Sequence, residues 1–92
     1  MFTEPRVNVI TSSEGYSVEV LGRTGLMYSE GKKSMRIDSE VLNQDEIAVV
    51  KSSIMAWSSP HEAEAIDDNK RDTIIENIRR AFVFNHKKID IW

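Results

Sequence analysis

The sequence predicts an α+β fold: a mostly antiparallel β-meander sheet, one C-terminal amphipathic helix packed on one face of that sheet, and a short final strand. Three observations predict this class. The first half of the chain alternates apolar and polar residues with a period of two. A single apolar stripe with helical spacing follows, and the last residues alternate again. With 92 residues, we expect a single domain over 1–92, in which 1–5 are poorly ordered.

The expected strands follow one another as a meander. They are the runs 6–11, 16–20, 26–28, 34–38 and 47–50, separated by turns rich in Gly, Ser and Asn. In the first run, Val7 and Val9 share one face. The last run is continuously apolar, which predicts the most buried and central strand.

Residues 67–85 have the pattern of an amphipathic helix. The apolar stripe falls at positions i, i+1, i+4, i+7 and i+8, which are Ile74, Ile75, Ile78, Ala81 and Phe82. Asp67 is the expected N-cap, and Asn85 is the expected left-handed residue at the C-terminal end. Ile89 and Ile91 then alternate with polar residues, which predicts the final strand.

The composition narrows the class of protein. The chain has 12 Lys and Arg against 15 Asp and Glu, and it has no Cys. This acidic balance argues against a nucleic-acid binder, and the lack of Cys excludes disulfides and favours a reducing compartment. The N-terminus lacks a signal-peptide pattern, and no apolar run is long enough to cross a membrane. We therefore expect a cytoplasmic protein with no membrane partner.

The junction between strands and helix contains a Trp and a Pro that no periodicity explains. Ile54 and Trp57 precede Pro60 there, so we expect a structural corner, with Trp57 supplying apolar surface and Pro60 ending regular pairing. Together with the helix stripe, the expected structural motif is Ile54, Trp57, Pro60, Ile74, Ile75, Ile78 and Phe82.

An acidic run begins immediately after this corner. It contains Glu62, Glu64, Asp67 and Asp68, and His61 precedes it. One interpretation is a solvated loop whose charges suit the N-terminal end of a helix dipole. The other is a docking surface, in which an exposed or half-exposed Trp57 anchors a basic protein partner and the acids steer it.

Catalytic and nucleic-acid sites have weaker support. His61 and His86 flank the helix, but they belong to no metal-ligand or acid/base motif, and surface roles explain both. The basic patch of Arg23, Lys32, Lys33 and Arg36 has acidic neighbours that cancel its charge. The four glycines all fall at expected turns, so no nucleotide-binding fingerprint is present. We expect no cofactor and no metal site.

The pattern of the second half matches a known family. Ile54-x-x-Trp57-x-x-Pro60-His61-Glu62 is followed by Ile66 and by a helix containing Lys70, Arg71, Ile74, Ile75, Glu76, Asn77, Ile78, Ala81, Phe82 and Phe84. From Tyr16 to Trp92 the chain resembles the immunity protein 74 family of bacterial polymorphic toxin systems, most specifically from Val50 to Phe84. The chain departs from the family's pattern where a glycine is expected after the helix, since Asn85 and His86 stand there.

The resemblance implies a small α+β protein that binds and neutralises a cognate toxin without catalysis. If the acidic surface faces a basic active site, the toxin is a nuclease-type enzyme. The candidate contact residues are Trp57, His61, Glu62, Glu64, Asp67 and Asp68. Two alternatives stay open: a general protein-interaction or oligomerising domain, and a small metal- or acid/base-dependent enzyme that uses His61 and His86.

Overall fold

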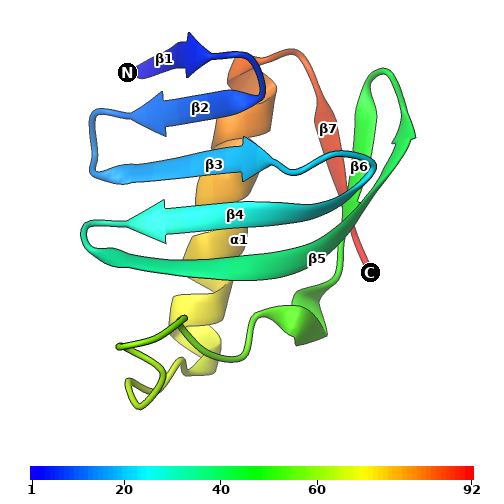
Figure 1. The fold of residues 1–92 in the computed structure, drawn as a ribbon. Coiled ribbons are helices and arrows are strands. Elements are labelled where there is room, and N and C mark those ends of the chain that lie inside the picture. The colour runs from blue at the N-terminus through cyan, green and yellow to red at the C-terminus, as the bar shows by residue number, and fades with distance from the viewer.

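The computed structural model describes residues Met1–Trp92 and confirms the α+β class. A sheet of seven strands carries one long helix, α1 (Asp68–Phe84), with a short 3-10 turn, η1 (Lys51–Ser53), before it (Figure 1). The strands are β1 (Phe2–Arg6), β2 (Val9–Ser12), β3 (Tyr16–Val20), β4 (Thr24–Glu30), β5 (Lys33–Asn43), β6 (Glu46–Val49) and β7 (Lys88–Ile91).

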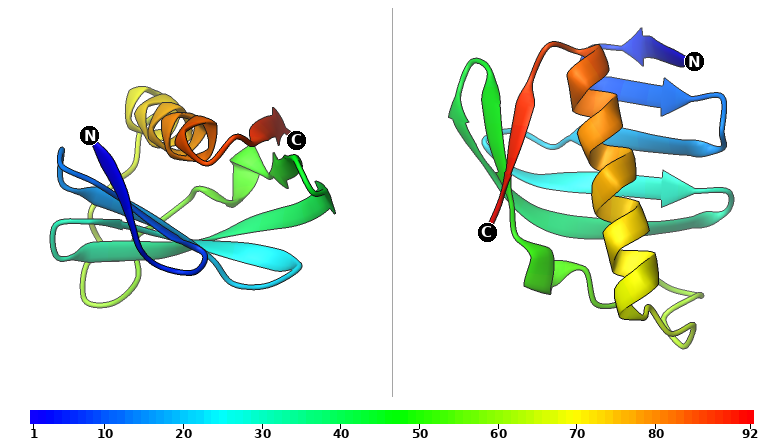
Figure 2. Two further views of the ribbon diagram at one scale, coloured as in Figure 1. Left: turned by 90° about the horizontal axis from the view of Figure 1, so that it is seen from above. Right: turned by 180° about the vertical axis from the view of Figure 1, so that it is seen from behind.

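The spatial order of the strands is their order in the sequence. Strands β1 to β6 pair antiparallel with their neighbours, whereas β7 returns after the helix and pairs parallel with β6, Ile47 opposite Ile89. The sheet is curled, and α1 crosses one face of it with its C-terminal end beside β7 (Figure 2). A parallel return of this kind requires a crossover element, and the helix provides it.

The core lies between the helix and the concave face of the sheet. The apolar stripe of α1 is buried as predicted, since Ile74, Ile78 and Phe82 each have 0% exposure. Alternating residues of the strands face it, and the members of this cluster from the sheet are Ile10, Tyr16, Val18, Leu26, Tyr28, Met35, Ile37, Ile47 and Val49. Each such side chain contributes about 1.5–3 kcal/mol on burial, so this contact holds the two layers together.

The start of the chain differs from the prediction. Phe2–Arg6 form the edge strand β1, whereas the sequence pattern predicts no strand before residue 6. The expected single strand over 6–11 is wrong, because a tight turn divides it at Val7 and Asn8. Val7 is 83% exposed at this turn, and Asn8 has a φ of 68°, a conformation that Asn tolerates better than most residues.

Two further boundaries need correction. The run 47–50 is buried as expected, but β6 is next to the edge strand rather than central. At the helix end, Asn85 has a φ of −94°, and the left-handed residue is His86, with a φ of 60°. The N–H groups of His86 and Lys87 donate to the carbonyls of Val83 and Phe82, which is the Schellman arrangement. His86 therefore takes the position where the family pattern led us to expect a glycine.

Candidate functional site

The two ends of α1 carry the two candidate sites. We call residues 54–68, which precede and begin the helix, the corner. Trp57 is the centre of the corner and is only 2% exposed. Its ring stacks on Tyr28 at a centroid separation of 6.2 Å, and Lys33 Nζ lies 4.9 Å from the ring centroid. The ring is therefore buried in the core, rather than exposed or half-exposed as the docking interpretation expects.

The corner is fastened to both layers of the fold. The Ser58 N–H donates to the Ser34 carbonyl at 2.7 Å, which attaches the corner to β5. The Arg71 Nε donates to the Ile54 carbonyl at 2.9 Å, which attaches it to α1. Pro60 follows a cis peptide bond and is exposed. These contacts explain why Ile54 and Trp57 act together as a corner between sheet and helix.

Most of the acidic side chains at the corner have partners within the chain. Glu64 pairs with Lys33 at 2.8 Å, and Asp68 pairs with Arg71 at 2.6 Å. Asp67 accepts from the Lys70 N–H at 2.8 Å, so it is the helix N-cap as predicted. Glu62 remains exposed and without a cationic partner, and the Ser59 hydroxyl beside it lowers the pKa of this carboxyl. His61 is half-buried beside it.

A polar cluster links the corner to the sheet beneath Trp57. The Tyr28 hydroxyl donates to Glu30 at 2.7 Å and accepts from Asn77 at 2.9 Å, and Lys70 pairs with Glu30. Burial raises the pKa of Tyr28, so its hydroxyl stays protonated. Burial acts to raise the pKa of Glu30 as well, but the hydrogen bonds from Lys70 and Tyr28 outweigh it and lower that pKa. Glu30 is therefore a charged acceptor within the fold.

The two histidines are too far apart to share a site. His61 lies before the helix and His86 after it, and the 17 residues of α1 between them span about 26 Å. A metal ion or a proton relay needs its groups within a few ångströms of one another. The geometry therefore removes the enzyme alternative in which His61 and His86 act together.

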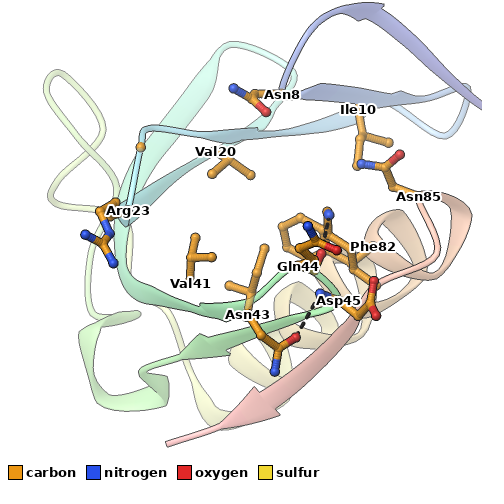
Figure 3. Close-up of a pocket in the computed structure, with 13 residues that line it drawn as sticks. Asn8, Ile10, Val20, Arg23, Val41, Asn43, Gln44, Asp45, Phe82 and Asn85 are labelled. Carbon is orange, nitrogen blue, oxygen red and sulfur yellow. Dashed lines mark hydrogen bonds between the residues drawn. The ribbon is translucent and has the colours of Figure 1, made fainter.

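At the C-terminal end of α1 the surface contains a cavity of about 690 Å³, which we call the mouth cavity. It opens between the β2–β3 side and the β5–β6 side of the curled sheet, with Phe82 behind it (Figure 3). Its apolar lining is Ile10, Val20, Val41, Ile47 and Phe82, and its polar rim includes Asn8, Arg23, Gln44, Asp45, Asn85 and Lys87.

The rim side chains differ from those of the corner because many of them have no partner. The side chains of Asn8, Arg23, Gln44 and Asn85 form no hydrogen bond or ion pair within the protein, while Lys87 Nζ donates to the Gln44 carbonyl at 2.7 Å. The other five arginines all pair with a carboxylate. The mouth cavity therefore combines an apolar interior with polar groups that are free to bind something else.

No pattern in the sequence predicts the mouth cavity. Its rim comes from four separate turns and strand ends, so no local spacing marks it. One signal was present: Leu21, Val41 and Leu42 are apolar residues next to turn residues, and they are 43%, 36% and 38% exposed. Apolar residues at a turn that bury nothing nearby in the sequence are candidates for a contact surface.

Comparison with protein families gives one result. The family model described as immunity protein 74 matches residues 17–92, which confirms the resemblance inferred from the corner and the helix. Neither the curated proteins nor the solved structures gave a match to this chain. The structure contains no helix that is both long and apolar enough to span a bilayer.

Proposed function

The chain belongs to the immunity protein 74 family, and on this basis we propose that it binds a cognate bacterial toxin and neutralises it by occlusion, without catalysis. The family match over residues 17–92 is the observation that carries the proposal. Occlusion requires an accessible surface with unused bonding capacity rather than a reactive constellation. The mouth cavity and the exposed part of the corner both meet that requirement.

The direct test is protection of cells from the toxin. The protein encoded immediately upstream would be expressed through its C-terminal domain, with and without this chain. We expect growth arrest without the chain, growth with it, and a purified complex of fixed stoichiometry. Continued arrest together with no complex in a binding titration would refute the proposal for this pair.

The corner would contribute to binding mainly through charge. We propose that Glu62, with its neighbours Glu64 and Asp68, attracts a basic toxin surface and raises the association rate, since charge acts at long range. Asp67 and Trp57 are left out of this proposal, because the Asp67 carboxylate caps the helix and the Trp57 ring is buried. The basic surface that such an acidic run would meet is consistent with a nuclease-type toxin.

A matched pair of variants tests this charge effect. Glu62→Lys with Asp68→Lys reverses charge at the corner, and Glu4→Lys with Glu14→Lys makes the same net change elsewhere on the exposed surface. We expect the first pair to lower the association rate about tenfold at low salt and the second to lower it less. Stopped-flow binding at several salt concentrations measures this. Equal effects would show that only net charge acts, and no effect of either pair would exclude steering.

Self-association is a second candidate function, and one observation favours it. The edge strand β1 is largely exposed, and an apolar patch lies beside it, in which Phe2 and Phe84 are in contact at 5.6 Å between ring centroids and Val83 is 62% exposed. An open edge next to apolar surface can pair with a second copy. Analytical ultracentrifugation over a range of protein concentrations tests self-association. If the measured mass remains that of a monomer at every concentration, self-association is ruled out.

A further inference from the structure

We propose that the mouth cavity is the anchor site for the toxin, and that it receives a protruding loop with an apolar side chain at its tip and a carboxylate beside it. This inference rests on the proposed function and identifies the surface that performs it. Four features of the cavity lead to it: its fixed floor, the free amides of its rim, the unpaired Arg23, and the exposed apolar residues around it.

The floor of the cavity is formed in advance of binding. Ile10, Ile47 and Phe82 are 2%, 3% and 0% exposed and belong to the central core cluster. Their positions are therefore set by packing against the helix and the sheet rather than by a ligand. A preformed apolar site lowers the entropy cost of binding, and about 690 Å³ lies within the roughly 300–1,000 Å³ of sites that enclose a compact ligand.

The amides of the rim indicate that the occupant contains peptide groups. A loop entering the cavity removes its backbone N–H and C=O groups from water, and these must find new hydrogen bonds. The side-chain amides of Asn8, Gln44 and Asn85 each offer two N–H donors and an acceptor, and none of these side chains is hydrogen-bonded within the protein. A purely hydrocarbon ligand would leave these groups desolvated and unpaired, which is costly.

Arg23 sets the charge that the loop carries. It is the one arginine without a carboxylate partner in this chain, and it lies across the mouth from Asp45 (Figure 3). A guanidinium binds a carboxylate with two parallel hydrogen bonds, which fixes the orientation of the partner as well as adding affinity. The acidic residue of the loop should therefore face Arg23.

Exposed apolar side chains are also found at the cavity. Val41 is itself a lining residue and is 36% exposed, and Leu21 and Leu42 adjoin the lining residues Gly22 and Asn43 in the sequence. Central apolar contacts bordered by polar groups are the usual arrangement of an interface that is bound tightly.

The test uses the C-terminal domain of the protein encoded immediately upstream, as in the protection experiment, and two pairs of variants. Val41→Arg places a long charged side chain at the wall of the cavity, and Val83→Arg is its control at an apolar position of α1 that is 62% exposed and does not line the cavity. Arg23→Glu reverses the free charge, and Lys32→Glu is its control at an exposed turn. Dissociation rate and affinity are measured by surface plasmon resonance, and folding by thermal unfolding.

We expect Val41→Arg to weaken binding about 30-fold or more and Arg23→Glu about tenfold or more, mainly through faster dissociation, while both controls stay within about threefold. The variants alter exposed positions, so their unfolding midpoints should match the wild type. If Val41→Arg is unstable, Gln44→Trp closes the cavity from the exposed β5–β6 turn and should give the same loss.

The outcomes separate the two proposals. The anchor site would be overturned if the wild-type protein binds the toxin and the variants Val41→Arg, Gln44→Trp and Arg23→Glu bind it equally well. The proposed function would stand in that case. Wild-type protein that neither binds nor protects would overturn the proposed function, and the anchor site with it. A photo-crosslinking residue at position 41 should capture the toxin, and one at position 83 should not.

Discussion

The two ends of α1 show opposite uses of polar side chains. At the N-terminal end, the acidic side chains of the corner are exposed but mostly paired: Glu64, Asp67 and Asp68 all bond to groups of the same chain. At the C-terminal end, Arg23 and Asn85 border an apolar cavity, and their side chains form no hydrogen bond or ion pair within the chain. The acidic run of the corner is easily seen in the sequence, but most of its bonds are made within the chain. The rim of the mouth cavity has no local sequence pattern, but its side chains remain available to a partner. Changes to the buried and bonded groups of the corner should therefore act mainly on stability, and changes at the mouth cavity should act mainly on affinity.

The largest effect should come from Trp57. Trp57→Ala empties a fully packed position and removes the ring that stacks on Tyr28, so we expect a loss of about 3–5 kcal/mol in the free energy of unfolding. Urea denaturation measures it. Val41→Ala, at a position 36% exposed, is the matched control and should cost about 0.5 kcal/mol or less. If Trp57→Ala remains stable but binds the toxin more weakly, Trp57 acts in binding rather than in stability, and the contrast between the corner and the mouth cavity is wrong.

A pair of tyrosines sharpens the same contrast within the core. Tyr28 and Tyr16 stack at 6.1 Å, but the Tyr28 hydroxyl has two partners, whereas the Tyr16 hydroxyl is buried without one. Tyr28→Phe should cost about 1–3 kcal/mol because it leaves Asn77 and Glu30 without their bonds. Tyr16→Phe removes an unpaired group and should be neutral or slightly stabilising. Chemical denaturation of both variants gives the two values, and equal losses would contradict this assignment.

The caps of α1 give a smaller and more direct comparison of its two ends. Asp67→Ala removes a side-chain acceptor for the Lys70 N–H and should cost about 1 kcal/mol. Asn85→Ala removes a side chain that bonds to nothing, while the backbone bonds that end the helix remain, so its stability should change by less than about 0.5 kcal/mol. Thermal unfolding with circular dichroism at 222 nm measures both. A larger loss for Asn85→Ala would show that its side chain has a structural role.

The smallest effect concerns acid stability at Glu30. Its pKa in the folded protein is below the ordinary value of 4.5, so its contribution to stability is present above about pH 4.5 and is lost as the pH falls through the folded pKa. Glu30→Gln should be less stable than wild type at pH 7, by about 1 kcal/mol. The two curves of unfolding free energy against pH should converge below pH 4.5. Parallel curves would show that Glu30 does not titrate with folding.

Local patterns in the sequence account for most of the fold. The stripe from Ile74 to Phe82 and the cap at Asp67 depend on neighbours within one helix, so periodicity and residue chemistry suffice to predict them. The division of the first run at Asn8 escaped prediction because Val7 and Val9 keep the spacing of a strand across the turn. A single left-handed residue breaks a strand without disturbing its hydrophobic pattern.

The candidate site was predicted less well because its properties depend on distant residues. Glu64 is neutralised by Lys33, and Glu30 by Lys70, pairs that are 31 and 40 residues apart in the sequence. The sequence alone therefore cannot show that these carboxylates have cationic partners, because the partners come from elements far away in the chain. The mouth cavity shows the converse: nothing near Arg23 in the sequence marks it as different from the other arginines, and its lack of a carboxylate partner is seen only in the folded structure.

The parallel pairing of β6 with β7 has a consequence for how the protein folds. Every other strand pair is a hairpin that closes over a few residues, whereas Glu46 meets Lys88 only after α1 has crossed the sheet. Closing that long loop costs more entropy than closing any of the hairpins, and contacts of high sequence separation slow folding. The rate-limiting step should therefore be the docking of the helix together with β7. Until that step is complete, β6 has an open edge on which an unfolded chain can pair, so the time spent in this state governs the tendency to aggregate.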